Sequence, residues 1–278
     1  MPRSDWYSDT DPRALEVFLE CQRRMSASAK VQGMLSLTRM VFETAEAEVR
    51  RQHPGIDERE AFLRPAARHL DRETMMRGLR MGPRARGRVS DPGQALHALI
   101  GALGRSAIPY LIGGPMASGI HGIYGTSLHV DLVADIHPGQ IARFIQELGG
   151  EFYADAGMMR DALESGRSFN LIHFASSYKF DIFPLSSDPF HQSQFSRREM
   201  RDIVLGGATL AVPVATAEDT LLMKLVWYRA GGEVSERQWN DVRGIVAVQR
   251  QRLDREYLRQ WAAYLKIADL VDAALGLA

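Results

Sequence analysis

Hydrophobic side chains in the first part of the chain recur at helical spacing. Residues 12–50 carry apolar positions three and four apart and few β-branched residues, which predicts a pair of helices. The sequence HPG at 53–55 ends the pattern, because proline cannot continue the helix before it. Asp57 is then placed to cap a short third helix that runs to about residue 69. A fourth helical segment is expected from about residue 71.

From residue 91 onward, short apolar runs alternate with glycine and proline, and helical patterns lie between them. This alternation is typical of α/β and α+β domains, so we expect a sheet. The expected strands are 107–112, 128–134, 151–154, 168–174 and 178–184, with a further pair near 202–213. The expected helices are 91–104, 115–121, 138–148, 156–165, 219–227, 235–251, 254–264 and 267–277. The polar stretch between the last two groups of strands is assigned to neither class.

A basic run separates these two parts. Residues 77–88 (RGLRMGPRARGR) hold five arginines, three glycines, one proline and no acidic residue, so they are unsuited to a core. We therefore predict a helical module in 1–76, a basic Gly/Arg linker in 77–93 and a second domain in 94–278. The linker is interpreted either as a solvated connection or as a patch that contacts phosphate. The N-terminal helices could also simply cover a face of the second domain or mediate dimerisation.

Overall composition excludes several functional classes. The 278 residues include 34 basic and 34 acidic side chains, so a chain-wide attraction to nucleic acid or to a membrane is excluded, although a local patch is not. Cys21 is the only cysteine, which excludes an intramolecular disulfide and a Cys-rich zinc site and fits a reducing compartment. Apolar stretches fall short of the roughly 20 residues of a membrane span, and the N-terminus lacks a signal-peptide pattern. We therefore expect a cytoplasmic protein with no membrane partner.

Two glycines follow the expected strand 107–112. Gly113 and Gly114 would let a phosphate group approach the backbone closely, and the helix expected directly after them would offer unpaired N–H groups at its positive end. A tight turn would need the same glycines. The pair is therefore a candidate phosphate-binding loop that requires support from other residues.

Two acidic residues interrupt segments that otherwise favour strands. Alternate residues of a strand share a face, so His129 and Asp131 point to one side of the strand 128–134 while its apolar residues point to the core. Asp181 lies in the middle of the apolar strand 178–184. A single carboxylate of this kind is commonly a structural ion pair. Two of them on neighbouring strands would form an oxygen-rich site suited to Mg²⁺.

At these residues the chain resembles the nucleotidyltransferase superfamily in its minimal bacterial form, which includes abortive-infection and other toxin–antitoxin nucleotidyltransferases. The family pattern is Gly-Gly or Gly-Ser after the first strand, an Asp-x-Asp pair on the next strand and a third Asp on a later one. Gly113-Gly114, HVD at 129–131 and Asp181 stand at those places. The resemblance covers roughly residues 94–278. It implies an α+β fold with a mixed sheet flanked by helices, preceded here by an all-helical module and followed by C-terminal helices.

The resemblance also implies an activity and its residues. A nucleotide would be transferred from an NTP to a hydroxyl of RNA or protein, with Asp131 and Asp181 as ligands of Mg²⁺ or Mn²⁺. Gly113, Gly114 and Lys224 would contact the NTP, with Lys224 facing a phosphate or a carboxylate. A protein partner or a second copy of the chain is a further expected partner.

His129 departs from the family pattern, because it stands where the family has the first Asp of its pair. Imidazole is a poor ligand for Mg²⁺, and the exchange removes one negative charge from the catalytic site. The sequence therefore leaves two functions open. One is transfer with His129 in the catalytic site, aided by a metal such as Mn²⁺. The other is a catalytically impaired nucleotide-binding or antitoxin-like protein.

Two further expectations concern the helices after the sheet. Asp241 is either an exposed helix acid or a brace on the active-site side. The aromatic residues Trp227, Tyr228 and Trp239 are expected in the core between the C-terminal helices, in preference to a platform on which bases stack.

Overall fold

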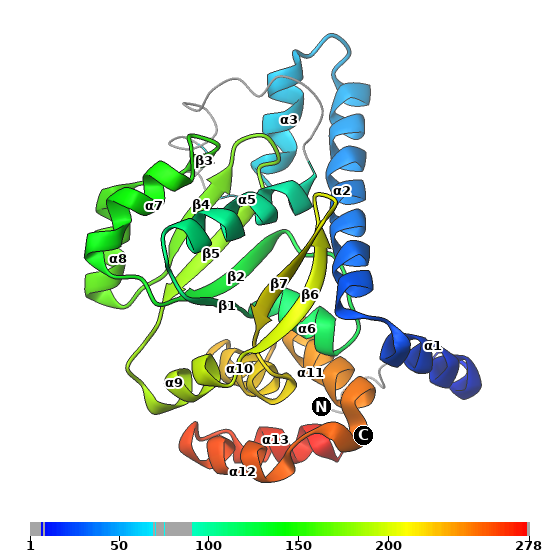
Figure 1. Ribbon diagram of the computed structural model, residues 1–278. Helices are drawn as coiled ribbons and strands as arrows, with labels where there is room; N and C mark the ends of the chain where they lie inside the picture. Colours follow the sequence, from blue (N-terminus) through cyan, green and yellow to red (C-terminus); the bar gives the residue numbers. More distant parts are fainter. Residues whose placement is uncertain (1–6, 8, 69, 71–74, 76–90, 277–278) are drawn as a thin grey trace.

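A seven-stranded mixed sheet forms the centre of the computed structural model, which describes residues 7, 9–68, 70, 75 and 91–276 (Figure 1). The strand order is β3-β4-β5-β2-β1-β7-β6. β1 is antiparallel to β2 and parallel to β7, and β2 is parallel to β5. The strands are β1 (Tyr110–Ile112), β2 (His129–Ala134), β3 (Phe152–Tyr153), β4 (Phe169–His173), β5 (Lys179–Pro184), β6 (Glu199–Leu205) and β7 (Ala208–Val214). The predicted α+β class, a mixed sheet flanked by helices, is confirmed.

Helices precede, flank and follow this sheet. They are α1 (Pro12–Arg24), α2 (Ala27–Gln52), α3 (Glu58–Ala66), α5 (Pro92–Arg105), α6 (Gly114–His121), α7 (Ile141–Glu147), α8 (Ala156–Ser165), α9 (Pro189–Ser196), α10 (Ala217–Ala230), α11 (Glu236–Gln249), α12 (Arg255–Tyr264) and α13 (Ala268–Leu275). Short 3₁₀ turns, η2 (Pro138–Gln140) and η3 (Arg250–Arg252), precede α7 and follow α11. The fourth helical segment expected from residue 71 and the linker residues up to 90 lie outside the described residues, apart from Met75.

Helix α9 corrects the sequence prediction, which assigned neither helix nor strand to this polar stretch. Its composition lacks a regular apolar face, but its start carries a recognisable signal. The Asp188 side chain accepts hydrogen bonds from the backbone N–H groups of Phe190 and His191, and Pro189 opens the helix. Phe190 is then fully buried in the core of the C-terminal helices. The capping residue and one aromatic anchor, together, hold α9 in place.

The alternation expected on β2 is present. Val130, Leu132 and Ala134 are buried, whereas His129 and Asp131 on the other face are only half-buried. This division places the apolar side chains in the main core under the sheet and leaves a polar face that chemistry can use.

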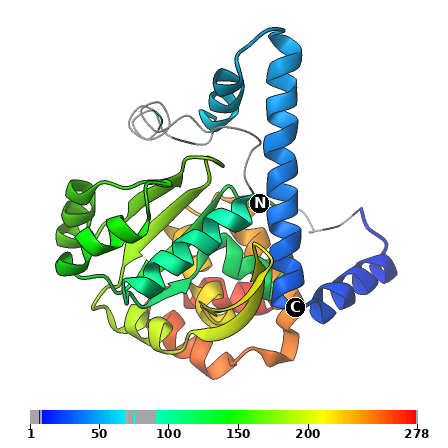
Figure 2. The ribbon, with the colours of Figure 1, turned by 45° about the horizontal axis from the view of Figure 1, so that its top comes forward.

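Helix α2 packs along the side of the sheet, against β6, α6 and α5 (Figures 1 and 2). Its apolar residues Val31, Met34 and Phe42 belong to the same buried cluster as the strands. This packing favours the interpretation in which the N-terminal helices cover the second domain. The division into 1–76, 77–93 and 94–278 stays a prediction, because most of the linker lies outside the described residues.

A buried lysine also joins α2 to α6. The Lys30 ammonium donates hydrogen bonds to the carbonyl oxygens of Ile120 (3.0 Å) and Gly122 (2.7 Å) at the C-terminal end of α6. A cation at this end of a helix satisfies carbonyl groups that have no partner within the helix and meets the negative end of the helix dipole. Burial lowers the pKa of Lys30 to about 8.

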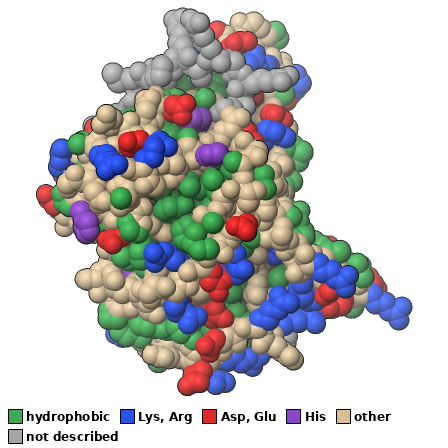
Figure 3. Space-filling model, in the orientation of Figure 1, with side chains coloured by type: hydrophobic (Ala, Val, Ile, Leu, Met, Phe, Trp, Pro, Cys, Tyr) green, Lys and Arg blue, Asp and Glu red, His purple; other side chains and the backbone are tan. Residues whose placement is uncertain are grey.

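Helix α1 is attached to the molecule through charged side chains. Figure 3 shows acidic and basic side chains interleaved over it, at the lower right. Arg23 pairs with Glu16 at 3.0 Å and donates to the carbonyl oxygen of Ala247, and Arg250 pairs with Glu16. Glu16 is exposed, and ion pairs with an exposed partner contribute little each, whereas the buried Leu19 adds an apolar contact.

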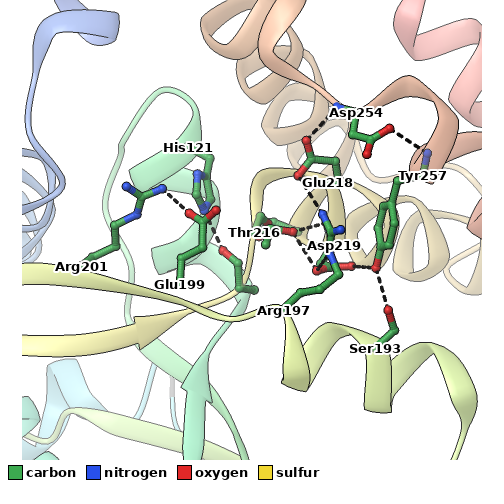
Figure 4. Close-up of polar contacts among 12 residues, drawn as sticks. His121, Ser193, Arg197, Glu199, Arg201, Thr216, Glu218, Asp219, Asp254 and Tyr257 are labelled. Carbon is green, nitrogen blue, oxygen red and sulfur yellow. Dashed lines mark hydrogen bonds and ion pairs between the residues drawn. The ribbon is translucent and has the colours of Figure 1, made fainter.

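A buried acid connects the C-terminal helices to the end of the sheet (Figure 4). Asp219 on α10 is completely buried, and it accepts hydrogen bonds from the hydroxyls of Thr216 (2.7 Å) and Tyr257 (2.6 Å). The Arg197 guanidinium lies 3.7 Å from the carboxylate and stacks over the Tyr257 ring. Both carboxylate oxygens are thus hydrogen-bonded to protein groups.

Across the described part of the chain, helices are too short or too polar to cross a membrane.

Candidate functional site

Strands β2 and β5 bring three of the predicted site residues together. The strands are parallel, and their register places Asp131 beside Asp181. One ligand atom from each of His129, Asp131 and Asp181 lies within 4.8 Å of the other two. The His129 Nε2 atom is 3.4 Å from Asp131 Oδ1. The expected juxtaposition of two carboxylates on neighbouring strands is therefore present, with the imidazole beside them.

The two glycines stand where the sequence placed them, between β1 and α6. Gly114 has a φ of +52°, and a Cβ atom there would overlap the carboxylate of Asp131. Only glycine allows this carboxylate to lie against the backbone. Among the described residues no side chain caps the start of α6, so the backbone N–H groups of its first turn, except at Pro115, which has none, remain available to an anion beside Asp131.

Two lysines flank the carboxylates. The Lys224 ammonium is nearly buried and lies 2.6 Å from Asp241 Oδ2. Lys224 was expected to face a phosphate or a carboxylate, and Asp241 was considered as a brace on this side of the protein; the structure joins the two. This ion pair holds the lysine in one position near the site.

The second lysine, Lys179, was missed by the sequence analysis. Its ammonium lies 3.0 Å from Asp181 Oδ1, and its position on β5 is paired with that of His129 on β2. A signal was available, because Lys179 precedes Asp181 by two residues and so shares its face of the strand. Across the two strands His129 of β2 is therefore paired with Lys179 of β5. Two residues farther along, Asp131 of β2 is paired with Asp181 of β5.

The electrostatics of the site favour an additional cation. Burial raises the pKa of Asp131, and the neighbouring Asp181 carboxylate raises it further. His129, Lys224 and Lys179 lower the pKa of Asp131 but do not cancel the effect of burial. A divalent cation between the carboxylates would stabilise their ionised forms.

The donor atoms fit one divalent ion. One imidazole nitrogen and two carboxylate oxygens are available, and Mn²⁺ accepts such a mixed set better than Mg²⁺, which prefers oxygen. A second ion would require a further carboxylate at the place of His129. It would also meet the Lys179 ammonium, which already occupies one oxygen of Asp181.

These residues line a cleft of about 770 Å³. Such a volume lies within the roughly 300–1,000 Å³ typical of sites for small molecules and cofactors. The glycines and the three potential metal ligands are on one side, and α10 and α11 contribute Lys224, Trp227 and Arg237. The cleft can therefore hold a ligand of nucleotide size with its charged end against the glycines and carboxylates.

Trp227 corrects the sequence prediction, which placed three aromatic residues in the core. Tyr228 and Trp239 are buried, with ring centroids 5.2 Å apart. Trp227 is 53% exposed and lines the cleft. The helical pattern did not reveal this, because exposure depends on where α11 packs against α10.

Comparison with known proteins gives no match to a family model and no match among curated proteins. Several solved structures resemble the chain, among them the following two. One is an antigenic nucleotidyltransferase-like protein from Paracoccidioides brasiliensis, with 15% identity, a TM-score of 0.41 and coverage of 68% of this chain and 94% of that one. The other is the antibiotic-resistance factor ANT(2'')-Ia, with 13% identity, a TM-score of 0.41 and coverage of 67% and 97%.

Proposed function

We propose that the protein is a nucleotidyltransferase that uses a divalent metal ion to transfer a nucleotide from an NTP to a hydroxyl of RNA or protein. One observation carries the proposal: Asp131 and Asp181 stand side by side on parallel strands, with the backbone of Gly114 against the Asp131 carboxylate, in one cleft. Phosphoryl transfer needs groups that hold a metal ion and groups that bind phosphate. The two carboxylates can supply the first, and the adjacent helix N-terminus can supply the second.

Each residue then has a definite task. Asp131, Asp181 and His129 would hold the ion, which supplies charge stabilisation on the reacting phosphate when bound. Gly113 and Gly114 leave room for the phosphate chain, and the first N–H groups of α6 orient it. Lys224, fixed by Asp241, places one positive charge beside the phosphates.

The transfer forms a bond between the acceptor oxygen and the α-phosphorus and breaks the bond from that phosphorus to the bridging oxygen. Pyrophosphate leaves with the bonding electrons. The acceptor hydroxyl would lose its proton to a carboxylate of the site, Asp131 or Asp181. Toxin–antitoxin membership, a bacterial cytoplasmic location and a protein partner or second copy belong to this proposal as its biological setting.

A second function is favoured by one feature of the same cleft. Lys179 already neutralises part of Asp181, and His129, unlike an aspartate, brings no negative charge. A site with so little net negative charge is better suited to bind a nucleoside triphosphate than to hold the two metal ions that would cleave it. The alternative is therefore a protein that binds NTP without transferring it, as an antitoxin-like or regulatory partner would.

The test separates these two functions. The full chain and a His129→Asp variant are incubated with each α-labelled NTP, bulk RNA and either Mg²⁺ or Mn²⁺, and label on RNA or protein is measured. We expect label with the unaltered chain in Mn²⁺ and more label with the variant in Mg²⁺. Label with the variant alone would assign the unaltered chain to the binding function. No label with either protein would contradict the proposal of transfer.

A further inference from the structure

The cleft carries an aromatic side chain for which the proposed chemistry gives no role. A tryptophan usually buries most of its large apolar surface, yet Trp227 leaves 53% of its surface accessible. It is the tryptophan that lines the cleft containing the carboxylates. An exposed aromatic ring in a polar cleft is a ready contact for a flat ligand group.

The position of Trp227 on α10 places it next to the groups proposed to bind phosphate. It follows Lys224 by three residues and Met223 by four, and residues at these spacings are neighbours on a helix surface. All three line the cleft. This wall of the cleft therefore presents an apolar strip, formed by Met223 and Trp227, directly beside a lysine.

The spacing along α10 suits a nucleotide. Three residues correspond to a rise of about 4.5 Å. Lys224 lines the same cleft as Asp131 and Asp181, so the lysine end of the strip belongs to the metal and phosphate positions. Trp227 lies one helical turn farther along. In a nucleotide the ribose stands between the base and the α-phosphate, so a phosphate beside Lys224 would place the base on the Trp227 side.

Arg237 adds a second recognition element on this wall. It is exposed near the start of α11 and lines the cleft together with Trp227. A guanidinium can stack on a ring or donate hydrogen bonds to acceptor atoms on its edge. The wall thus offers one apolar face and one set of donors, which suits an aromatic heterocycle.

We propose that Trp227 is the platform on which the base of the bound NTP stacks, an inference that rests on the proposed function. Stacking on one aromatic face tolerates every base, because each base has a π-face. Larger rings overlap the indole more completely, so purine nucleotides bind more tightly than pyrimidine nucleotides. The platform fixes the base while the glycines and Lys224 fix the phosphates.

The test compares two ligands that differ only in the presence of a nucleoside. Binding of ATP and of inorganic triphosphate to the full chain is measured by calorimetry in Mn²⁺, for the unaltered chain, Trp227→Leu and Trp227→Phe. Tyr264→Leu is the matched control, because Tyr264 is also an exposed aromatic residue, 48% accessible, but lies outside the cleft. Thermal unfolding of each variant confirms that it is folded.

We expect Trp227→Leu to weaken ATP binding about tenfold or more and to leave triphosphate binding unchanged. Trp227→Phe retains part of the affinity, and Tyr264→Leu retains all of it. Unchanged ATP binding by folded Trp227→Leu would overturn the platform and leave the proposed function standing. Equal weakening of ATP and triphosphate would also overturn it, because a general disturbance of the cleft would then explain the loss. Absence of binding of both ligands to the unaltered chain would overturn the proposed function itself.

Discussion

Two aspartates, the half-buried Asp131 and the fully buried Asp219, show how similar electrostatic settings can serve different ends. Burial raises the pKa of both carboxyls. Both oxygens of Asp219 are hydrogen-bonded, to Tyr257 and to Thr216. Among the described residues, the Asp131 carboxylate receives no hydrogen bond; it faces His129 at 3.4 Å and lines the cleft.

The difference teaches that a raised pKa alone does not mark a functional carboxylate. Each oxygen of Asp219 accepts one hydrogen bond, from the cap residue of α10 and from a tyrosine of α12, and an arginine at the end of α9 lies beside it, so Asp219 connects helices (Figure 4). Asp131 accepts no hydrogen bond from the described residues and lines a cleft that a ligand can enter. The unfilled capacity, combined with an adjacent cleft, distinguishes a candidate binding group from a structural one.

The largest expected effect is on metal binding. Asp131→Asn and Asp181→Asn each remove a charged ligand, so we expect the affinity for Mn²⁺ to fall by more than the roughly 10–100-fold that changes in ligand-supporting groups produce. For Asp131→Asn the free energy of unfolding without metal should stay the same or rise, because burial disfavours its charge, whereas Asp181→Asn also removes the ion-pair partner of Lys179. Titration followed by electron paramagnetic resonance measures the affinity. Asp219→Asn is the control and should bind Mn²⁺ normally; equal loss in all three variants would break the comparison.

The second largest expected effect is a loss of stability on removal of Asp219, the acid that connects the helices. Asp219→Ala leaves the hydroxyls of Tyr257 and Thr216 without their buried acceptor, and we expect the free energy of unfolding to fall by about 3 kcal/mol. Denaturation by urea measures it. A loss below about 1 kcal/mol would show that the network carries less of the structure than its geometry indicates.

Substitution of the two glycines tests whether Asp131 must lie where it does to bind a metal ion. Gly114→Ala places a methyl group where the Asp131 carboxylate lies, so we expect Mn²⁺ affinity to drop more than about tenfold. Gly113→Ala is the matched control, since its Cβ would meet only the Leu111 side chain at 3.9 Å. Calorimetric titration of both variants measures the effect. Equal affinities would mean that the carboxylate can move without cost to the site.

The smallest effect is a pH dependence at Lys30. Burial lowers its pKa to about 8, against roughly 10.4 in an unfolded chain. Between these values the unfolded chain holds the proton and the folded chain does not, so the free energy of unfolding rises with pH. We expect the unaltered chain to gain about 1 kcal/mol over Lys30→Met across this interval, less than the full shift implies, because two carbonyl groups favour the ammonium form. If the difference in the free energy of unfolding between the unaltered chain and Lys30→Met fell with rising pH, the lowered pKa of Lys30 would be contradicted.

Local patterns in the sequence were sufficient to predict the sheet and much of the candidate site. Alternation on β2 separated Asp131 from the core, and the interrupted apolar run on β5 singled out Asp181. These signals depend on a period of two residues, which is a local property. The placement of Gly113 and Gly114 followed from the same reasoning, because a strand end and a helix start are both visible in the sequence.

The features that were missed depend on contacts between distant segments. The apolar face of α2 was predictable, but its packing against the second domain was only one of the alternatives left open, because periodicity does not reveal what a face packs against. The exposure of Trp227 depends on where α11 lies, and the ion pair of Lys179 depends on the rotamer it adopts beside Asp181. Helix α9 rests on one cap and one buried phenylalanine, which is too little for a periodic signal.

The most direct test of the account measures transfer and stability on the same three proteins. The unaltered chain, Asp131→Asn and Asp219→Asn are incubated with α-labelled NTPs, RNA and Mn²⁺ at equal concentrations of folded protein. The account predicts label with the unaltered chain and with Asp219→Asn, and none with Asp131→Asn, while only Asp219→Asn unfolds at lower urea concentration. Equal labelling by the unaltered chain and Asp131→Asn would contradict the claim that this cleft is the site of nucleotidyl transfer.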